Sequence, residues 1–108
     1  MSSVFQVAWS RTAVRDLTGI IEYIFADNQT DERRALAKIK KAAAGLFHDP
    51  FRGLVIPELQ EQGMVHYREL IIAPWRLMYR VEGETVYVVS LIDSRRNVED
   101  ILLGRFGP

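Results

Sequence analysis

Apolar and polar positions alternate with a period of two at the start of the chain and again in its second half. Residues 4–9 place alternate apolar side chains on one side, which is the pattern of a strand with one buried face. Three further runs of this kind cover residues 65–72, 75–82 and 85–92, with two residues between successive runs. Links of this length predict antiparallel hairpins, because a crossover to a parallel neighbour needs many more residues.

Between the first strand and the other three, apolar residues recur every three or four positions in two stretches. The first stretch follows Ser10, a residue type that caps helices, and ends near Asn28. The second follows Thr30, another candidate cap, and continues to Phe47. Because the connection between them is short, we expect an antiparallel pair of helices. A final helix is expected after Asn97, which is again a capping residue type.

Gly19 lies inside the first of these helical stretches. Glycine in a helix interior costs about 1 kcal/mol relative to alanine. Its small size permits the close approach of a neighbouring element.

The expected order of elements is strand, helix, helix, three strands, helix. It predicts one α+β domain over residues 1–108, β-α-α-β-β-β-α, in which a helical hairpin packs on one face of an antiparallel sheet. Residues 48–63 contain Pro50 and Gly53 and break the helical period, so we expect a long loop there.

The two faces of the predicted sheet differ in character. Hairpin geometry places on the first face Trp75, Leu77, Tyr79, Val81, Leu70, Ile72, Val86, Val88, Ile92 and Arg68. The second face carries Tyr67, Glu69, Ile71, Arg76, Met78, Arg80, Tyr87, Val89 and Leu91. The first face is almost entirely apolar, so we expect it to pack on the helices. The second is predicted to lie uncovered and to serve as a binding surface.

Composition excludes several kinds of chemistry. The 108 residues include no cysteine, so disulfides, thiolate metal sites and a cysteine nucleophile are ruled out. His48 and His66 have no partner at metal-ligand spacing, and we predict neither a metal nor another cofactor. The 14 basic and 14 acidic residues cancel, so bulk charge gives no argument for nucleic-acid binding. The chain shows no secretory signal pattern and no long apolar run, which favours a cytoplasmic protein without membrane contact.

Arginine is the residue type that most suggests a binding role. The candidates for contacting a target or a partner protein are Arg68, Arg76, Arg80, Arg95 and Arg96. The last two follow the third hairpin strand, where we expect them to converge with Arg76 at one end of the sheet. Guanidinium groups gathered in this way suit bidentate recognition of phosphate, and equally an acidic protein segment.

A structural interpretation is the alternative for these charged residues. Arg76 and Arg80 are then ordinary solvated strand residues paired with Glu69 or Glu82. Glu58 has no acidic partner nearby in the sequence, so solvation or a structural contact is its expectation from residue type alone.

Four motifs occur in an order that resembles a known family. They are Pro57-Glu58-Leu59, Tyr67-Arg68-Glu69-Leu70, Trp75-Arg76-Leu77-Met78-Tyr79-Arg80-Val81 and Asp93-Ser94-Arg95-Arg96. The sequence resembles the RelE/ParE superfamily of toxins from type II toxin–antitoxin systems, often labelled plasmid stabilisation proteins. The resemblance covers nearly the whole chain.

One branch of this superfamily, the RelE-like branch, cuts mRNA in the ribosomal A site. If it applies here, the resemblance implies that Arg76 lies beside the scissile phosphate, that Glu58 is the catalytic base and that Arg96 is a further phosphate contact. That branch usually ends in a catalytic Tyr or His–Tyr, where this sequence has Asp100 or Ile101. In-line cleavage needs an acid for the departing oxygen or equivalent charge stabilisation, and no candidate is evident.

The resemblance therefore favours the ParE-like branch, whose members are not nucleases and whose known members poison DNA gyrase. Zero net charge agrees, because a ribosome binder gains much of its affinity by neutralising phosphates. A third interpretation is a homologue that has lost toxicity and keeps antitoxin binding. In each case the family implies a cognate antitoxin, whose C-terminal segment wraps the toxin in a hetero-oligomer over the helical hairpin and the sheet edge.

Overall fold

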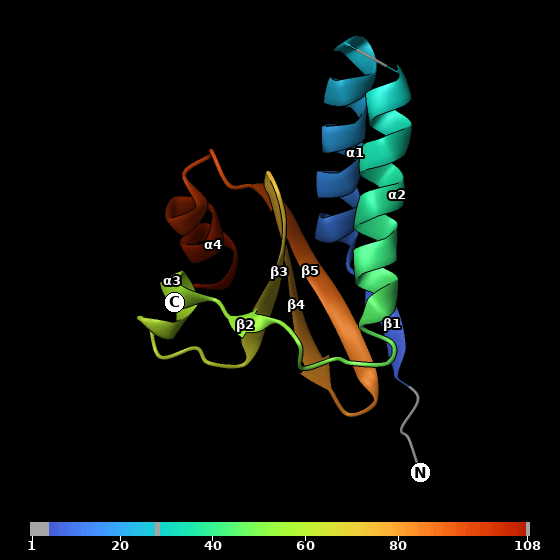
Figure 1. Cartoon of the computed structure of the whole chain (residues 1–108). Helices are drawn as coiled ribbons and strands as arrows, with labels where there is room; N and C mark the ends of the chain where they lie inside the picture. The colour runs from blue at the N-terminus through green and yellow to red at the C-terminus, as the bar shows by residue number, and fades with distance from the viewer. Residues whose placement is uncertain (1–4, 28, 108) are drawn as a thin grey trace.

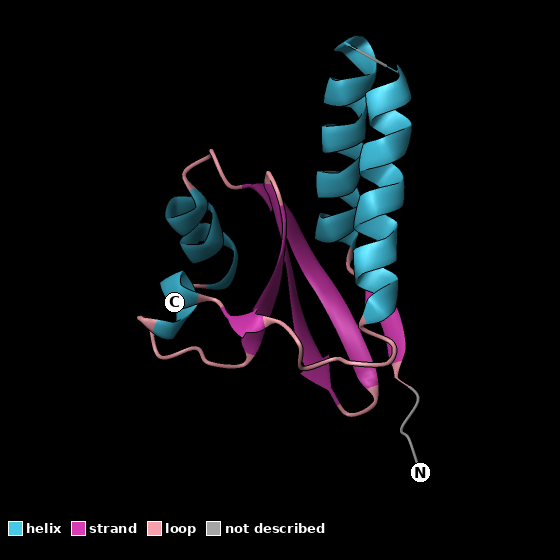
Figure 2. Cartoon of the chain, viewed as in Figure 1, coloured by secondary structure: helices cyan, strands magenta, loops and turns pink. Residues whose placement is uncertain are grey.

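The computed structural model describes residues 5–27 and 29–107, which form three layers with a twisted sheet in the middle (Figure 1). The elements in chain order are β1 (Gln6–Trp9), α1 (Arg11–Asp27), α2 (Gln29–Gly45), β2 (Leu54–Val55), α3 (Pro57–Gln60), β3 (Tyr67–Ile72), β4 (Trp75–Glu82), β5 (Thr85–Asp93) and α4 (Val98–Phe106). The α1–α2 hairpin stands on one side of the sheet, and α3 and α4 lie on the other (Figure 2). The α+β class and the helical hairpin are confirmed.

The sheet has the strand order β1-β5-β4-β3-β2. Strands β3, β4 and β5 form the two predicted antiparallel hairpins, and the two-residue links hold Ile72 opposite Trp75 and Glu82 opposite Thr85. Strand β1 differs from the expectation, because it pairs with β5 in parallel and makes the sheet mixed. A short link fixes the direction of a hairpin strand, whereas the helical hairpin that follows β1 leaves its direction to tertiary packing.

The first sheet face packs on α1 and α2 as predicted. Ala13 on α1 and Ile39 on α2 are fully buried in one core cluster with Leu77 and Tyr79 of β4. Ser10 caps α1 as expected, since its Oγ accepts a hydrogen bond from the Ala13 amide at 3.0 Å. Helix α2 begins earlier than the sequence indicated.

Helix α2 is described from Gln29, one residue before the expected cap Thr30. Asn28, the expected end of the first helix, lies outside the described residues, and α1 is described to Asp27. Helix boundaries inferred from capping residue types are uncertain by one or two positions, because several polar residues near a helix start compete for the role.

The predicted placement of Leu91 and Ile92 is wrong because β5 contains a β-bulge. Met78 pairs with Ser90 and Tyr79 with Val88, so Val89 between them has no partner on β4. One extra residue reverses the alternation beyond it. Leu91 consequently packs with the helical-hairpin core and Ile92 with the core on the other face, the reverse of the expectation.

The second sheet face is largely covered, contrary to the prediction. Segment 48–63, expected to be one loop, contains β2 and α3, and α3 packs beside α4 over this face. Ile56 and Leu59 from this segment are fully buried with Met78 and with Leu102 of α4.

Within the described residues, no helix has both the length and the apolar character needed to cross a bilayer.

Asp16 of α1 ties the two helical layers together around the edge of the sheet. Its Oδ2 accepts a hydrogen bond from the Leu91 amide at 3.0 Å. This contact pairs a backbone group of β5 beyond the point where β1 ends. Arg105 of α4 binds both oxygens of the same carboxylate at 2.8 and 2.9 Å and donates to Ser90 at 2.9 Å. This ion pair holds the C-terminal helix against the body of the protein.

Candidate functional site

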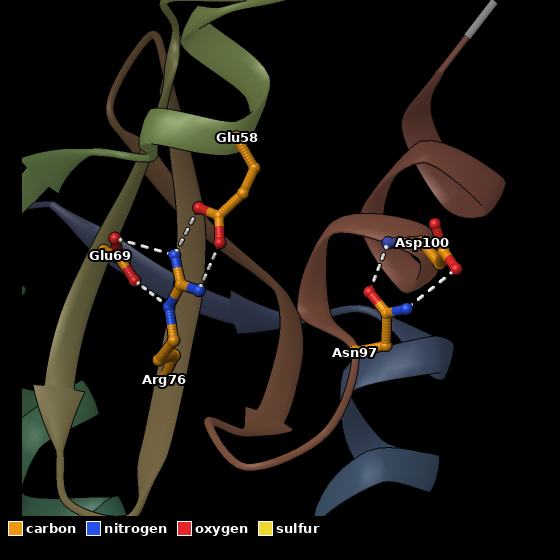
Figure 3. Close-up of polar contacts among 5 residues, drawn as sticks. All are labelled: Glu58, Glu69, Arg76, Asn97 and Asp100. Carbon is orange, nitrogen blue, oxygen red and sulfur yellow. Dashed lines mark hydrogen bonds and ion pairs between the residues drawn. The ribbon is translucent and has the colours of Figure 1, made fainter.

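Arg76 lies between two carboxylates on the second sheet face (Figure 3). Its Nη1 and Nη2 donate to the two oxygens of Glu58, both at 2.7 Å. Its Nε and Nη2 donate to the two oxygens of Glu69 at 2.5 and 3.0 Å. The guanidinium is therefore bidentate to both partners, the geometry that gives the strongest charge-assisted hydrogen bonds.

Three different elements supply this cluster. Arg76 on β4 faces Ile71 across the ladder, so Glu69 is its diagonal neighbour on the same face of β3. Glu58 reaches it from α3, which Pro57 starts at the first helical position. The pairing of Arg76 with Glu69 agrees with the structural interpretation, but Arg76 is mostly buried and not solvated as expected. Glu58 is the partner that the sequence did not reveal.

The side chains of these ion pairs are mostly buried. The exposed fractions of the Arg76, Glu58 and Glu69 side chains are 12%, 22% and 8%. Hydrogen bonding to Arg76 lowers the pKa of Glu58 against the opposing effect of burial. The Glu58 and Glu69 carboxylates together raise the pKa of Arg76 above its ordinary value. Two carboxylates on one guanidinium leave a formal charge of −1, so the cluster does not attract phosphate.

Arg68 lies on the other face of the sheet, where it contacts the segment before β2. Its Nη1 donates to the carbonyl of Gly53 at 2.7 Å, and its guanidinium lies over the Phe51 ring at 5.5 Å. The Gly53 amide in turn donates to the buried Tyr79 hydroxyl at 2.9 Å. A Cβ at Gly53 would lie 2.6 Å from that hydroxyl oxygen, which explains the glycine. Arg68 thus holds the segment that contains Phe51 and Gly53, just before β2.

Arg80 is engaged further along the second face. It forms an ion pair with Glu82, as the structural interpretation predicted, and lies over the Tyr87 ring at 4.7 Å. Tyr67 is its partner across the β3–β4 ladder. Arg80 lies four positions beyond Arg76 on β4, about 13 Å along an extended strand. These tyrosines therefore accompany Arg80 and do not supply a proton donor beside Arg76.

Arg95 and Arg96 do not converge with Arg76. They line a groove on the α1 side of the sheet, together with Trp75 and Asp93. Arg95 is held by Asp93, whose pKa it lowers through hydrogen bonding. Arg96 is exposed. The predicted arginine cluster is therefore divided between two sides of the sheet.

The start of α4 occupies the region where the nuclease branch carries its terminal Tyr or His–Tyr. Asn97 accepts from the Asp100 amide at 3.3 Å, and its own amide group donates to the Asp100 carboxylate at 2.9 Å (Figure 3). This reciprocal arrangement confirms Asn97 as the cap of α4. Asp100 serves the helix start.

Sequence reasoning missed the Asp16–Arg105 pair and the α1 side of the groove. Asp16 and Arg105 lie 89 positions apart, so no local pattern links them. Gly19 lies in the groove wall. This glycine inside a helix, whose small size allows another element to approach closely, was the one sequence feature that pointed to this surface.

Comparison with known proteins identifies the family of the chain. A family profile described as the ParE toxin of the type II toxin–antitoxin system, parDE, matches residues 7–98. The chain therefore belongs to the ParE toxin family and is a type II toxin of the RelE/ParE superfamily. A comparison with curated proteins found no significant match.

Solved structures agree on the fold. The chromosomal ParDE toxin–antitoxin system from P. aeruginosa aligns with a TM-score of 0.68 at 20% identity, covering 85% of this chain and 98% of that one. The toxin–antitoxin complex RelBE2 from Mycobacterium tuberculosis has a TM-score of 0.60 at 21% identity, covering 86% and 94%. The YoeB/ParE toxin from Agrobacterium tumefaciens has a TM-score of 0.58 at 21% identity, covering 82% and 98%.

Proposed function

We propose that this toxin arrests growth in the cytoplasm by inhibiting DNA gyrase through protein–protein contact, without chemistry of its own. A cognate antitoxin neutralises it by direct binding in a toxin–antitoxin hetero-oligomer. The family profile and the ParDE neighbour support the ParE-like branch, whose known members act on gyrase.

The saturation of Arg76 is the observation that carries this proposal. A nuclease arginine must offer N–H groups to the scissile phosphate, and Arg76 directs four hydrogen bonds to Glu58 and Glu69. A general base works best with a pKa near the operating pH, and Arg76 moves the pKa of Glu58 in the opposite direction. The cluster is therefore suited to holding α3 on the sheet.

A RelE-like mRNA endonuclease is the second candidate, and one observation favours it. Glu58 and Arg76, the base and phosphate arginine implied by the superfamily, lie in direct contact although they are 18 positions apart. For cleavage, the substrate phosphate would have to displace a carboxylate from Arg76. Arg96, the third residue of that interpretation, lines the groove on the α1 side.

Side-by-side assays of the purified toxin distinguish the two candidates. We expect inhibition of gyrase supercoiling and intact message in a translation extract. Codon-specific cuts would reverse the assignment. A toxin that binds its antitoxin but shows neither activity would be the non-toxic homologue.

The variant Glu58→Gln sharpens the same comparison. Gyrase inhibition per folded molecule should stay within about threefold of wild type, whereas an endonuclease that uses this base loses at least about a hundredfold in rate. Circular dichroism of the variant provides the folding control.

A further inference from the structure

The exposed face of helix α2 carries a concentration of basic side chains. They form two rows at helical spacing, and all of them are exposed. One row is Arg34, Lys38 and Lys41, and the other is Arg33 and Lys40. The acidic residues of the same helix, Asp31 and Glu32, lie in its first turn. No carboxylate therefore follows Arg33 along α2.

Small residues form the crest between the two rows. Ala37 and Ala44 are exposed, on the side of α2 opposite the buried Ala35, Ile39 and Ala43. Because alanine is short and the flanking lysines and arginines are long, the charged groups extend past this crest on both sides. An elongated anionic partner can therefore lie close to the helix while both rows of cations reach it.

The segment after α2 adds another cation to one row. A Cβ built on Gly45 would lie 2.9 Å from Nη1 of Arg52, so this guanidinium rests on the last turn of the helix. Gly45 is four positions beyond Lys41 and continues the row that begins at Arg34. The glycine thus makes room for a guanidinium where the next side chain of the row would stand.

The fold does not neutralise these cations. Neither the basic residues of α2 nor Arg52 form an ion pair among the described residues, whereas Arg76 and Arg105 are each held by a carboxylate. The chain as a whole has no net charge, so the positive charge is concentrated on this face. The α1–α2 hairpin also extends past the end of the sheet (Figure 1), and the basic rows point away from the core.

The length and charge of this face fit a nucleic-acid backbone. From Arg34 to Gly45 the helix rises about 16 Å, and duplex DNA of this length carries about ten phosphate charges. Lysine and arginine are the side chains that neutralise such phosphates and release their counterions. A membrane surface fits poorly, because insertion requires large apolar side chains and the crest carries alanine.

We propose that the exposed face of α2, extended by Arg52, binds the phosphate backbone of duplex DNA. The choice of DNA among nucleic acids rests on the proposed inhibition of gyrase, an enzyme whose substrate is duplex DNA. The contact is independent of base sequence, since cations that reach phosphates carry no sequence information. The toxin then engages gyrase where the enzyme holds its DNA.

Fluorescence anisotropy of a labelled DNA duplex, titrated with the purified full-length toxin, tests the assignment. We expect a dissociation constant below about 100 μM at low salt. Affinity should fall steeply as salt is added, with a slope of about −5 in a double-logarithmic plot, because each neutralised phosphate contributes about −0.9.

The triple variant Arg34→Gln, Lys38→Gln and Lys41→Gln removes one row of cations. Glutamine is a good helix former and these positions are exposed, so the thermal midpoint should stay close to that of wild type. Affinity for the duplex should fall at least about thirtyfold at low salt, and the salt slope should become shallower by about 3. Arg33→Gln with Lys40→Gln removes the other row and gives an independent measurement, with an expected loss of at least about fivefold.

The matched control is Arg11→Gln, Arg15→Gln and Arg96→Gln. These arginines are exposed and form no ion pair within the described part of the chain, and Arg15 and Arg96 line the groove on the α1 side of the sheet. The control makes the same change in net charge away from α2. Its affinity for the duplex should therefore stay within about threefold of wild type.

The outcomes separate this inference from the proposed function. A wild-type toxin that inhibits gyrase but does not bind the duplex overturns the DNA assignment and leaves the proposed function intact. Equal losses in the two triple variants also overturn it, because net charge alone then explains the binding. A toxin that binds the duplex through α2 but does not inhibit gyrase keeps the assignment and contradicts the proposed function. Tighter binding of an RNA duplex of the same length would overturn the choice of DNA.

Discussion

The Arg76 cluster and the α1 groove show two uses of arginine on opposite sides of one sheet. Arg76 is mostly buried and gives four hydrogen bonds to two carboxylates. Arg15 and Arg96 are exposed and form no ion pair among the described residues. The residue type is the same, but what it offers a partner depends on which carboxylates the fold brings to it. An ion pair satisfied within the chain stabilises the fold, whereas an unpaired surface charge is available for recognition.

The largest expected effect follows the loss of Arg76. Arg76→Met leaves Glu58 and the buried Glu69 facing each other without a cation, so the free energy of unfolding should fall by about 3 kcal/mol in urea denaturation. Replacing both carboxylates as well, by Glu58→Gln and Glu69→Gln, should restore much of the loss. A decrease below about 1 kcal/mol in the single variant would show that the cluster does not hold α3 in place.

The second-largest loss of stability is expected for the Asp16–Arg105 ion pair. This pair is partly exposed, but it links α1 to α4. Arg105→Met should lower the free energy of unfolding by about 1–2 kcal/mol, since Ser90 and Asp16 lose the Arg105 guanidinium as a donor, while Asp16 keeps the Leu91 amide. Urea denaturation measures the change. A loss as large as that in Arg76→Met would contradict this ranking.

The change of the free energy of unfolding at acid pH tests the ion pair between Glu58 and Arg76. A carboxyl whose pKa is lower in the folded state than in the unfolded chain stabilises the fold above its ordinary pKa of 4.5, and this contribution is lost as the pH falls through the folded value. Relative to wild type, Glu58→Gln should cost about 1 kcal/mol at neutral pH and progressively less below about pH 4.5. Parallel stability profiles at all pH values would show that Arg76 does not stabilise the ionised Glu58.

The smallest effect is expected at Arg96. Arg96→Met should change the free energy of unfolding by less than about 0.5 kcal/mol, because the side chain is exposed and forms no ion pair in the described structure. The same urea denaturation that detects the loss of Arg76 serves as the measurement. A loss comparable to that of Arg76→Met would erase the distinction between the two sides of the sheet.

Local patterns in the sequence predicted the elements and much of the first core. The two-residue links fixed the β3–β4–β5 meander, and Ser10 and Asn97 cap helices as their residue types indicated. The bulge at Val89 was not visible, because most side chains of β5 are apolar and the alternation carries no mark of the extra residue. The prediction of Leu91 and Ile92 was wrong for that reason.

The candidate site was predicted only in part. Glu69 and Arg76 were placed on one face by hairpin geometry, and this pairing is confirmed. Glu58 was named through the family resemblance, yet its contact with Arg76 depends on a helix in a segment that was expected to be a loop. Arg95 and Arg96 were expected beside Arg76 because they are near it along the sheet, but their side of the sheet depends on the turn after β5 and on the position of α1.

The sequence by itself determined the α+β class, the hairpin meander, the helix caps Ser10 and Asn97, and the family, because periodicity, short links and ordered motifs act over a few neighbouring residues. Only the tertiary structure decided which arginines are neutralised and which remain available. Ion pairs such as Glu58–Arg76 and Asp16–Arg105 join residues 18 and 89 positions apart. Electrostatic pairing acts through space over a few ångströms, so it becomes known only when the chain is folded.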